Sequence, residues 1–99
     1  MKLSRLQKFI LQQSYDKGKK VPRSQFYKFY DGKKLPPKAE DKVKILTKSL
    51  ERLIDRGLLV GFGEITEYKW YIREVKLTNR GKAAAKKLLG VQAVLPLRK

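Results

Sequence analysis

The sequence predicts an α+β fold made of three helices, a β-hairpin and a last helix. In the first half of the chain, and again after residue 78, apolar residues recur three and four positions apart, the spacing of one helix face. Between residues 58 and 77 the chain carries runs rich in aromatic and β-branched residues, which is typical of paired strands. The 99 residues suffice for one domain with one modest core, which we place at 1–90. Residues 91–99 are then a C-terminal tail, either disordered or an interaction segment.

The first predicted helix covers residues 3–15. One face of it holds Leu3, Leu6, Ile10 and Ser14, with Phe9 beside them. The segment YDKGKK, with its glycine and its charges, ends the helix. Arg5, Lys8 and two glutamines interrupt the apolar residues, so we interpret this stretch as a helix of the domain and not as a signal peptide.

The second predicted helix is short, about residues 23–31. Pro22 suits the start of an element, and Ser24 can cap it. The residues at core spacing are Phe26, Phe29 and Tyr30, with Tyr27 left outside. Asp31-Gly32 breaks the pattern, and Pro36-Pro37 ends the linker to the next helix.

The third predicted helix has the most regular pattern. Its apolar stripe, as wide as a core-facing helix requires, consists of Val43, Leu46, Leu50, Leu53 and Ile54. The opposite face carries Lys38, Asp41, Ile45, Lys48, Arg52 and Arg56. Gly57 follows at the position where a left-handed residue ends a helix.

Two strands, 58–65 and 70–77, follow this helix and turn around residues 67–69. The glycines of Gly61-Phe62-Gly63 lie within the first strand, and the helix and lysine of a phosphate-binding loop do not follow them. They therefore predict a β-bulge. Thr78 or Asn79 then caps the last helix, which Gly90 ends.

The charge of the chain is strongly one-sided. Lysine and arginine number 25 against 9 acids, which gives a net charge of +16 and a pI near 10.3. Such an excess attracts polyanions, as in DNA-, RNA- and ribosome-binding proteins. The chain has no cysteine and no histidine, which excludes disulfides, thiolate zinc sites and imidazole catalysis.

The remaining ionisable residues do not indicate an enzyme. The carboxylates show no paired arrangement for acid–base chemistry or for a metal, so we expect no catalytic activity and no cofactor. No ligand pocket can be inferred, and we predict no small-molecule ligand. No apolar run reaches membrane-spanning length, so we expect a soluble, cytoplasmic protein that does not bind membranes.

The order of the elements predicts a winged helix-turn-helix. The second and third helices form the helix-turn-helix within a three-helix core, the hairpin is the wing, and a C-terminal helix follows. Two segments, LTKSLERLIDRGLL and VKLTNRGKAAAKKLL, resemble the winged helix-turn-helix domains of the MarR-like regulator families. The matching residues are Leu53, Arg56, Gly57, Leu58 and Leu59 in the first segment, and Val75, Leu77, Thr78 and Gly81 in the second. The resemblance covers residues 39–89, and it implies a DNA-binding domain.

Two features depart from the family. The linker DGKKLPPKAED is longer than the usual turn between the two helices, and the long additional helices that dimerise full-length regulators have no counterpart. A homodimer would therefore have to use the first helix, the last helix or the tail.

The third helix carries most of the predicted DNA-binding residues, because an α-helix fits the major groove and basic side chains reach phosphates and guanine edges. Those residues are Lys38, Lys42, Lys44, Ile45, Lys48 and Arg52. Arg52 suits a bidentate guanine contact, although it lies near the C-terminal end of the helix. Ile45 could touch a thymine methyl or form one wall of a protein interface. The alternative is a solvated helix face that contacts nothing.

The resemblance implies that Lys69 and Arg73 of the wing lie along the backbone or the minor groove. Trp70 could stack on an unpaired base, or it could pack inward on the core. These residues complete the hypothesis of a transcriptional regulator that binds double-stranded DNA. Two alternatives remain open: an RNA- or ribosome-associated protein with the same fold, and a protein-interaction module that uses Ile45, Tyr27 and the tail.

Overall fold

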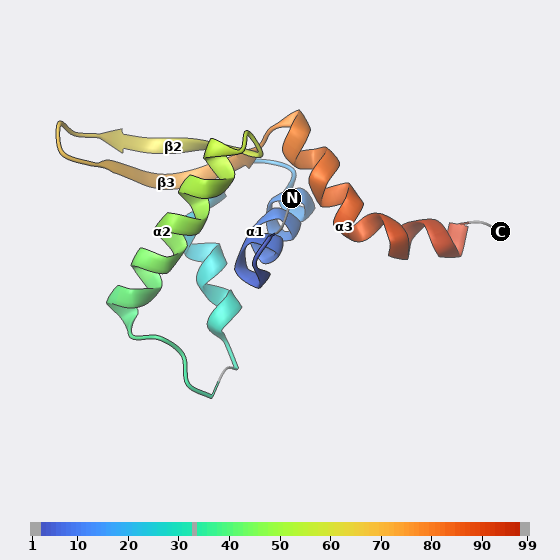
Figure 1. Cartoon of the computed structure of the whole chain (residues 1–99), viewed down its shortest axis with the longest axis horizontal. Helices are drawn as coiled ribbons and strands as arrows, with labels where there is room; N and C mark the ends of the chain where they lie inside the picture. Colours follow the sequence, from blue (N-terminus) through green and yellow to red (C-terminus); the bar gives the residue numbers. More distant parts are fainter. Residues whose placement is uncertain (1–2, 33, 98–99) are drawn as a thin grey trace.

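The computed structural model describes residues 3–32 and 34–97, and its side chains through residue 88. The helices are α1 (Arg5–Lys17), the 3-10 helix η1 (Arg23–Tyr30), α2 (Ala39–Asp55) and α3 (Asn79–Leu97), and the strands are β1 (Val21–Pro22), β2 (Leu59–Ile65) and β3 (Trp70–Leu77). The strands form one antiparallel sheet in the order β1-β3-β2 (Figure 1). The predicted α+β class is confirmed.

Helix α1 begins at a capping box. The backbone N–H of Gln7 donates to the Ser4 hydroxyl over 3.1 Å, and the Ser4 N–H donates to the Gln7 side-chain oxygen over 2.9 Å. Two of the N–H groups that a helix start leaves unpaired are thereby satisfied. Gly18 ends the helix with φ 66°, as the glycine in YDKGKK predicted.

The short helix predicted over 23–31 is confirmed, and it is a 3-10 helix. Its last bond shows the i→i+3 pattern, from the Asp31 N–H to the Lys28 carbonyl. Arg23 holds its start in place by donating to the Ile72 carbonyl at 3.0 Å and to the Thr47 hydroxyl at 2.7 Å. Ser24 lies inside this helix, and Pro22 occupies the cap position without a side-chain bond.

Helix α2 buries Leu46, Leu50 and Leu53, each at most 1% exposed. The prediction for Val43 is wrong, since 47% of it is exposed: this first part of the helix extends beyond the edge of the core. At the other end Gly57, with φ 77°, donates to the Ile54 carbonyl over 2.9 Å. Leu58 donates to the Leu53 carbonyl over 3.0 Å, which completes a Schellman motif.

The hairpin agrees closely with the predicted strands 58–65 and 70–77. Its register shifts between Phe62 and Gly63, so the predicted bulge is confirmed. A Cβ at Gly63 would lie 1.8 Å from the Tyr71 carbonyl oxygen, so the close approach of β3 requires glycine there. Strand β1, which pairs Val21 with Val75, was not predicted because two residues are too few to show a period.

Helix α3 starts at the predicted cap, where the Gly81 N–H donates to the Thr78 hydroxyl over 2.9 Å. The helix continues to Leu97, so the predicted end at Gly90 is wrong. Glycine inside a helix costs only about 1 kcal/mol relative to alanine and does not by itself end one. Of the predicted tail, residues 91–97 are helical, and 98–99 lie outside the described residues. Its role as an interaction segment stays a prediction.

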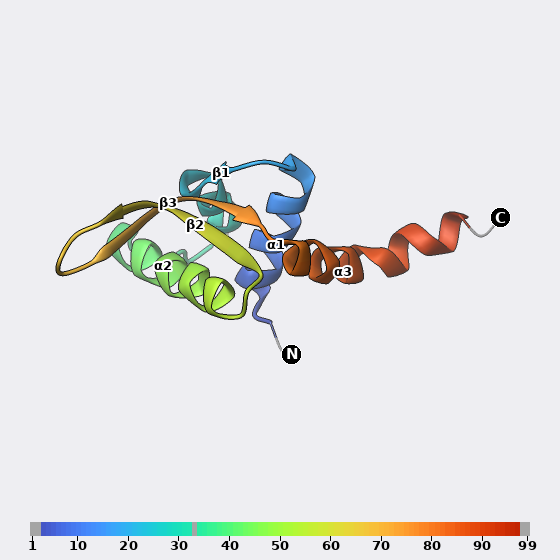
Figure 2. The same cartoon turned by 90° about the horizontal axis from the view of Figure 1, so that it is seen from above.

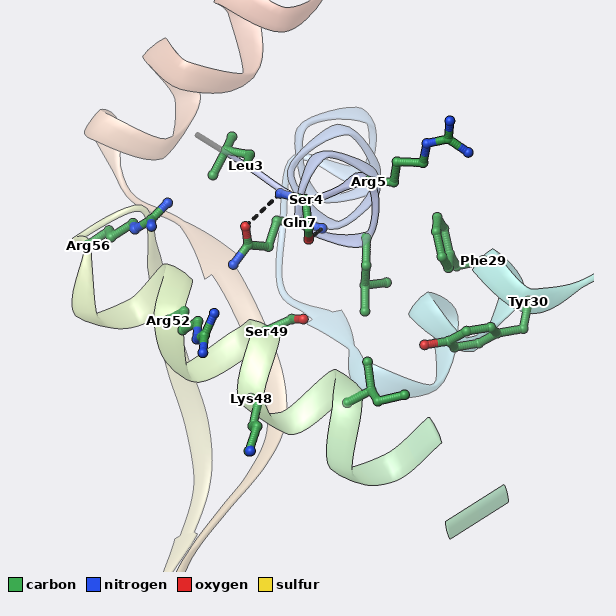
Figure 3. Close-up of a pocket in the computed structure, with 12 residues that line it drawn as sticks. Leu3, Ser4, Arg5, Gln7, Phe29, Tyr30, Lys48, Ser49, Arg52 and Arg56 are labelled. Atoms are coloured by element: carbon green, nitrogen blue, oxygen red, sulfur yellow. Dashed lines mark hydrogen bonds between the residues drawn. The ribbon is translucent and has the colours of Figure 1, made fainter. Parts of the chain in front are cut away.

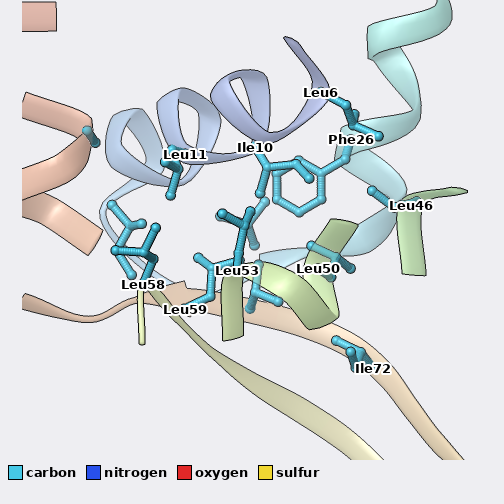
Figure 4. Close-up of a cluster of buried hydrophobic side chains, with 14 residues drawn as sticks. Leu6, Ile10, Leu11, Phe26, Leu46, Leu50, Leu53, Leu58, Leu59 and Ile72 are labelled. Atoms are coloured by element: carbon cyan, nitrogen blue, oxygen red, sulfur yellow. The ribbon is translucent and has the colours of Figure 1, made fainter. Parts of the chain in front are cut away.

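The core lies where α1, η1 and α2 meet the sheet (Figure 4). Leucine and isoleucine from α1 and α2 surround Phe26 of η1, which is fully buried. The hairpin turn and the start of α2 project from one side of this core, and the end of α3 projects from the other, in both views (Figures 1 and 2). No helix in the described part of the chain is long and apolar enough to cross a membrane.

Candidate nucleic-acid interface

The outward face of α2 is exposed and carries a row of basic side chains, and the carboxylates of Glu40, Asp41 and Asp55 are exposed on the same helix. Lys44, Lys48 and Arg52 lie four residues apart, so that they form one row along the helix, away from its buried leucines. Ile45 lies beside this row with 41% of its surface exposed. The structure therefore brings four of the predicted site residues together on one face, as the sequence indicated.

A cleft of about 760 Å³ adjoins this face, between α2, the start of α1 and the end of η1 (Figure 3). Ile45, Lys48 and Arg52 line it from α2. Arg56 and, on the side of α1, Arg5 also line it. The described lining thus includes four cationic side chains and no carboxylate, so its potential is positive.

Sequence reasoning did not assign Arg5 and Arg56 to the site. Arg56 was placed on the outward side of the third helix, but Arg5 had no signal because its position depends on how α1 packs against α2. Arg5 lies in the first turn of α1, where the partial positive charge of the helix end adds to the field.

Lys38 and Lys42 lie at the start of α2. Lys38 is the exposed N-cap residue and makes no side-chain cap bond. Lys42 is half-buried, and its ammonium lies 5.5 Å from the centre of the Tyr30 ring, within the range of a cation–π interaction. Lys42 is therefore turned toward η1, while Lys38 adds an exposed positive charge at the start of the helix, outside the row.

The aromatic residues of η1 form a wall of the cleft. The Phe29 ring lies 5.4 Å from the Phe9 ring of α1 in a tilted arrangement, and 5.3 Å from the Tyr30 ring in an edge-on arrangement. Burial raises the pKa of the Tyr30 phenol, and the neighbouring Tyr27 raises it further. These rings pack on the core and are not a free stacking surface.

The two predicted DNA-binding cations of the wing are both engaged. The Arg73 Nε donates to the Glu64 carboxylate over 2.8 Å, across the strands of the hairpin. The Lys69 ammonium lies 5.3 Å from the centre of the Tyr71 ring. Both groups are exposed, so solvent screening weakens these contacts and the side chains can exchange partners.

Trp70 packs inward, which was one of the two interpretations left open. Its ring lies against Gly61, where a Cβ would meet the ring at 2.9 Å and the Ile54 side chain at 2.9 Å. Trp70 is half-buried against the core. The glycine is thus needed to seat this ring, and the tryptophan anchors the hairpin to α2.

The arrangement of helices and hairpin is similar to that of solved winged-helix regulators. It superposes on the adhesin competence repressor AdcR from Streptococcus pyogenes with a TM-score of 0.61 and 17% identity, over 93% of this chain and 59% of that one. It superposes on ZitR from Lactococcus lactis with a TM-score of 0.60 and 17% identity, over 94% of this chain and 55% of that one. It superposes on a second AdcR structure with a TM-score of 0.56 and 17% identity, over 99% of this chain and 67% of that one.

These similarities establish the fold. The chain has a winged helix-turn-helix fold similar to that of these structures, with η1 and α2 as the helix-turn-helix and β2–β3 as the wing. It spans less than two thirds of the length of the first two structures. No protein-family model matches the sequence, and no curated protein sequence matches it significantly.

Proposed function

We propose that the protein is a transcriptional regulator that binds double-stranded DNA, with α2 in the major groove and the wing on the backbone. The observation that carries this proposal is the outward face of α2, where Lys44, Lys48 and Arg52 form an exposed row on a winged-helix fold. An α-helix has the width that the major groove admits. An exposed helix face that carries such a row suits that groove.

The side chains of this face differ in what they can recognise. The planar guanidinium of Arg52 matches the two acceptors on the guanine edge, whereas Lys44 and Lys48 are point charges suited to phosphates. Ile45 offers an apolar surface to a thymine methyl. We place Lys38, at the start of α2, on a neighbouring phosphate, and Arg5 and Arg56 on the phosphates that flank the cleft.

The wing contributes Lys69 and Arg73. Arg73 must exchange Glu64 for a phosphate, which its exposed position permits. We further propose that two copies bind a two-fold site, because winged-helix regulators of this kind commonly bind palindromic DNA. We infer a binding function without catalysis or a cofactor, exercised in the cytoplasm.

The experiment that tests the proposal is a titration of duplex DNA at two salt concentrations. Each phosphate neutralised contributes about −0.9 to the slope of log affinity against log salt concentration, so a flat response would contradict the proposal. Selection from random duplexes then reveals sequence preference, and an enriched palindrome supports the dimer. Competition with structured RNA at matched salt distinguishes DNA binding from the RNA- or ribosome-associated alternative.

A substitution experiment addresses the protein-interaction alternative. Lys48→Glu combined with Arg52→Glu reverses the charge of the α2 face, and Lys86→Glu combined with Lys87→Glu makes the same change on the exposed surface of α3. We expect the first pair to abolish duplex binding and the second pair to weaken it only through net charge. Equal effects of the two pairs would indicate that α2 is not the binding surface.

A further inference from the structure

The hairpin ends in two large side chains that contact almost nothing. Ile65 is 80% exposed and Tyr68 is 90% exposed, whereas the other exposed hydrophobic residues of the hairpin, Val60 and Tyr71, are 45% and 47% exposed. One exposed apolar side chain is ordinary on a protein surface, but two large ones at the same turn are a candidate contact site. The tip of the hairpin is therefore a candidate contact surface.

The turn that carries these side chains is tightly held by Thr66. The Thr66 N–H and hydroxyl both donate to the Lys69 carbonyl, at 2.8 Å and 3.0 Å. The same hydroxyl accepts the N–H groups of Tyr68 at 3.2 Å and Lys69 at 3.0 Å. Because the backbone is already ordered, the tip loses little conformational entropy when it binds.

The tip of the wing, residues 65–69, carries no arginine. Arg73 lies back along the strand and pairs with Glu64, so the large side chains at the turn are Ile65 and Tyr68, and Lys69 is the single cation there, beside Thr66 and Glu67. Insertion of an arginine into a narrow minor groove is thus not the natural use of this tip. Apolar side chains such as isoleucine instead act as wedges between base steps in DNA-bending proteins.

We propose that Ile65 and Tyr68 form an apolar wedge that enters the minor groove, partly separates adjacent base pairs and bends the DNA toward the major groove. This inference rests on the proposed function. The tip and the start of α2 project from the same side of the molecule (Figures 1 and 2), so both can engage one duplex. The net charge of +16 favours a polyanion over an apolar protein surface as the occupant. Lys69 lies next to the wedge, where it can reach a phosphate.

Glu67 lies in the same exposed turn. Its carboxylate faces water in the free protein and would approach the backbone phosphates once the wedge is inserted. Glu67→Gln should therefore strengthen duplex binding several-fold without reducing the bend, because it removes repulsion and leaves the apolar side chains in place.

The test measures the bend by energy transfer between dyes at the ends of a short duplex. We expect the wild type to bend the duplex by an angle of about 20–90°, the range of intercalating wedges. Ile65→Ser combined with Tyr68→Ser should remove most of the bend and weaken binding about tenfold. Val60→Ser, at the base of the same hairpin, is the matched control and should leave both quantities unchanged.

A fluorescent base analogue at the bent step gives an independent readout. Unstacking raises its fluorescence with the wild type, and with Ile65→Leu combined with Tyr68→Phe, but not with the serine pair. Circular dichroism of the serine pair should match the wild type, since both side chains are exposed. If the wild type does not bind duplex DNA, the proposed function itself fails. Binding with a straight duplex, or an equal loss of bending in Val60→Ser, overturns the wedge alone.

Discussion

The Thr78 hydroxyl donates a 2.6 Å hydrogen bond to the Gly57 carbonyl, and it joins the end of α2 to the start of α3. The Thr78 N–H donates to the neighbouring Leu58 carbonyl over 3.1 Å, and the hydroxyl accepts from Gly81. Thr78 therefore links the residues that precede the wing to those that follow it. The orientation of α2 relative to the hairpin depends on this junction.

Thr78→Val should lower the free energy of unfolding by about 1–3 kcal/mol, because it removes both hydroxyl bonds while keeping the shape of the side chain. Thr78→Ser, which keeps the hydroxyl, should lose less than half as much. Urea denaturation followed by circular dichroism measures the difference. Asn79→Ala, at the exposed next position, is the control and should change stability little.

Gly81→Ala should destabilise the protein by more than about 3 kcal/mol. A Cβ at this position would lie 1.9 Å from the Leu58 carbonyl oxygen and 2.9 Å from the Leu77 side chain, so α3 would have to move away from the hairpin. Gly18→Ala provides the contrast, because a Cβ added at Gly18 would have no atom within 4 Å, and only the φ of 66° opposes the substitution. We expect about 1 kcal/mol for Gly18→Ala. Similar losses for both variants would contradict the close contact at Gly81.

The hairpin and the outward face of α2 could be predicted from the sequence because each depends on local pattern. Aromatic and β-branched residues marked both strands, and the 3.6-residue period separated Lys48 and Arg52 from the buried leucines. The error at Val43 has the same origin: the period gives the direction of a side chain but not where the core ends.

The rest of the site depends on contacts between segments far apart in the chain. Arg5 reaches the cleft only because α1 packs against α2, and no periodicity carries that information. Arg73 meets Glu64 across a bulged register, where pairing cannot be counted from the turn. The helical course of α3 beyond Gly90 was missed because glycine opposes a helix only weakly.

The ionisation of Tyr30 should make stability depend on pH in the alkaline range. Burial raises the pKa of this phenol above its ordinary value of 10.0, so the folded protein keeps the proton at a pH where the unfolded chain has lost it. Stability is therefore full below pH 10 and decreases as the pH rises through the folded-state pKa. Tyr30→Phe lacks this loss, and its stability relative to the wild type should improve above pH 10. Tyrosinate absorbance should show a late-ionising tyrosine in the wild type that is missing in the variant.

Glu64→Gln should strengthen duplex binding, because Arg73 no longer has a carboxylate to leave before it contacts a phosphate. The slope of log affinity against log salt concentration should stay the same, because Arg73 contacts a phosphate in both complexes. Asp16→Asn removes the same charge at the exposed end of α1 and serves as the control for net charge. If both variants gained equal affinity, the gain would come from net charge alone and Arg73 would not contact the backbone.

Lys48 and Arg52 should differ in what their loss does to binding, since one is assigned to a phosphate and the other to a base. Lys48→Ala should weaken binding to all duplexes uniformly and make the salt slope less negative by about 0.9. Arg52→Ala should cost about 1–3 kcal/mol on the preferred sequence and relax discrimination at one guanine. Filter binding on the selected duplex and on its single-base variants, at two salt concentrations, separates the two outcomes. A uniform loss from Arg52→Ala would assign Arg52 to the backbone, and base recognition would then have to come from residues nearer the start of α2.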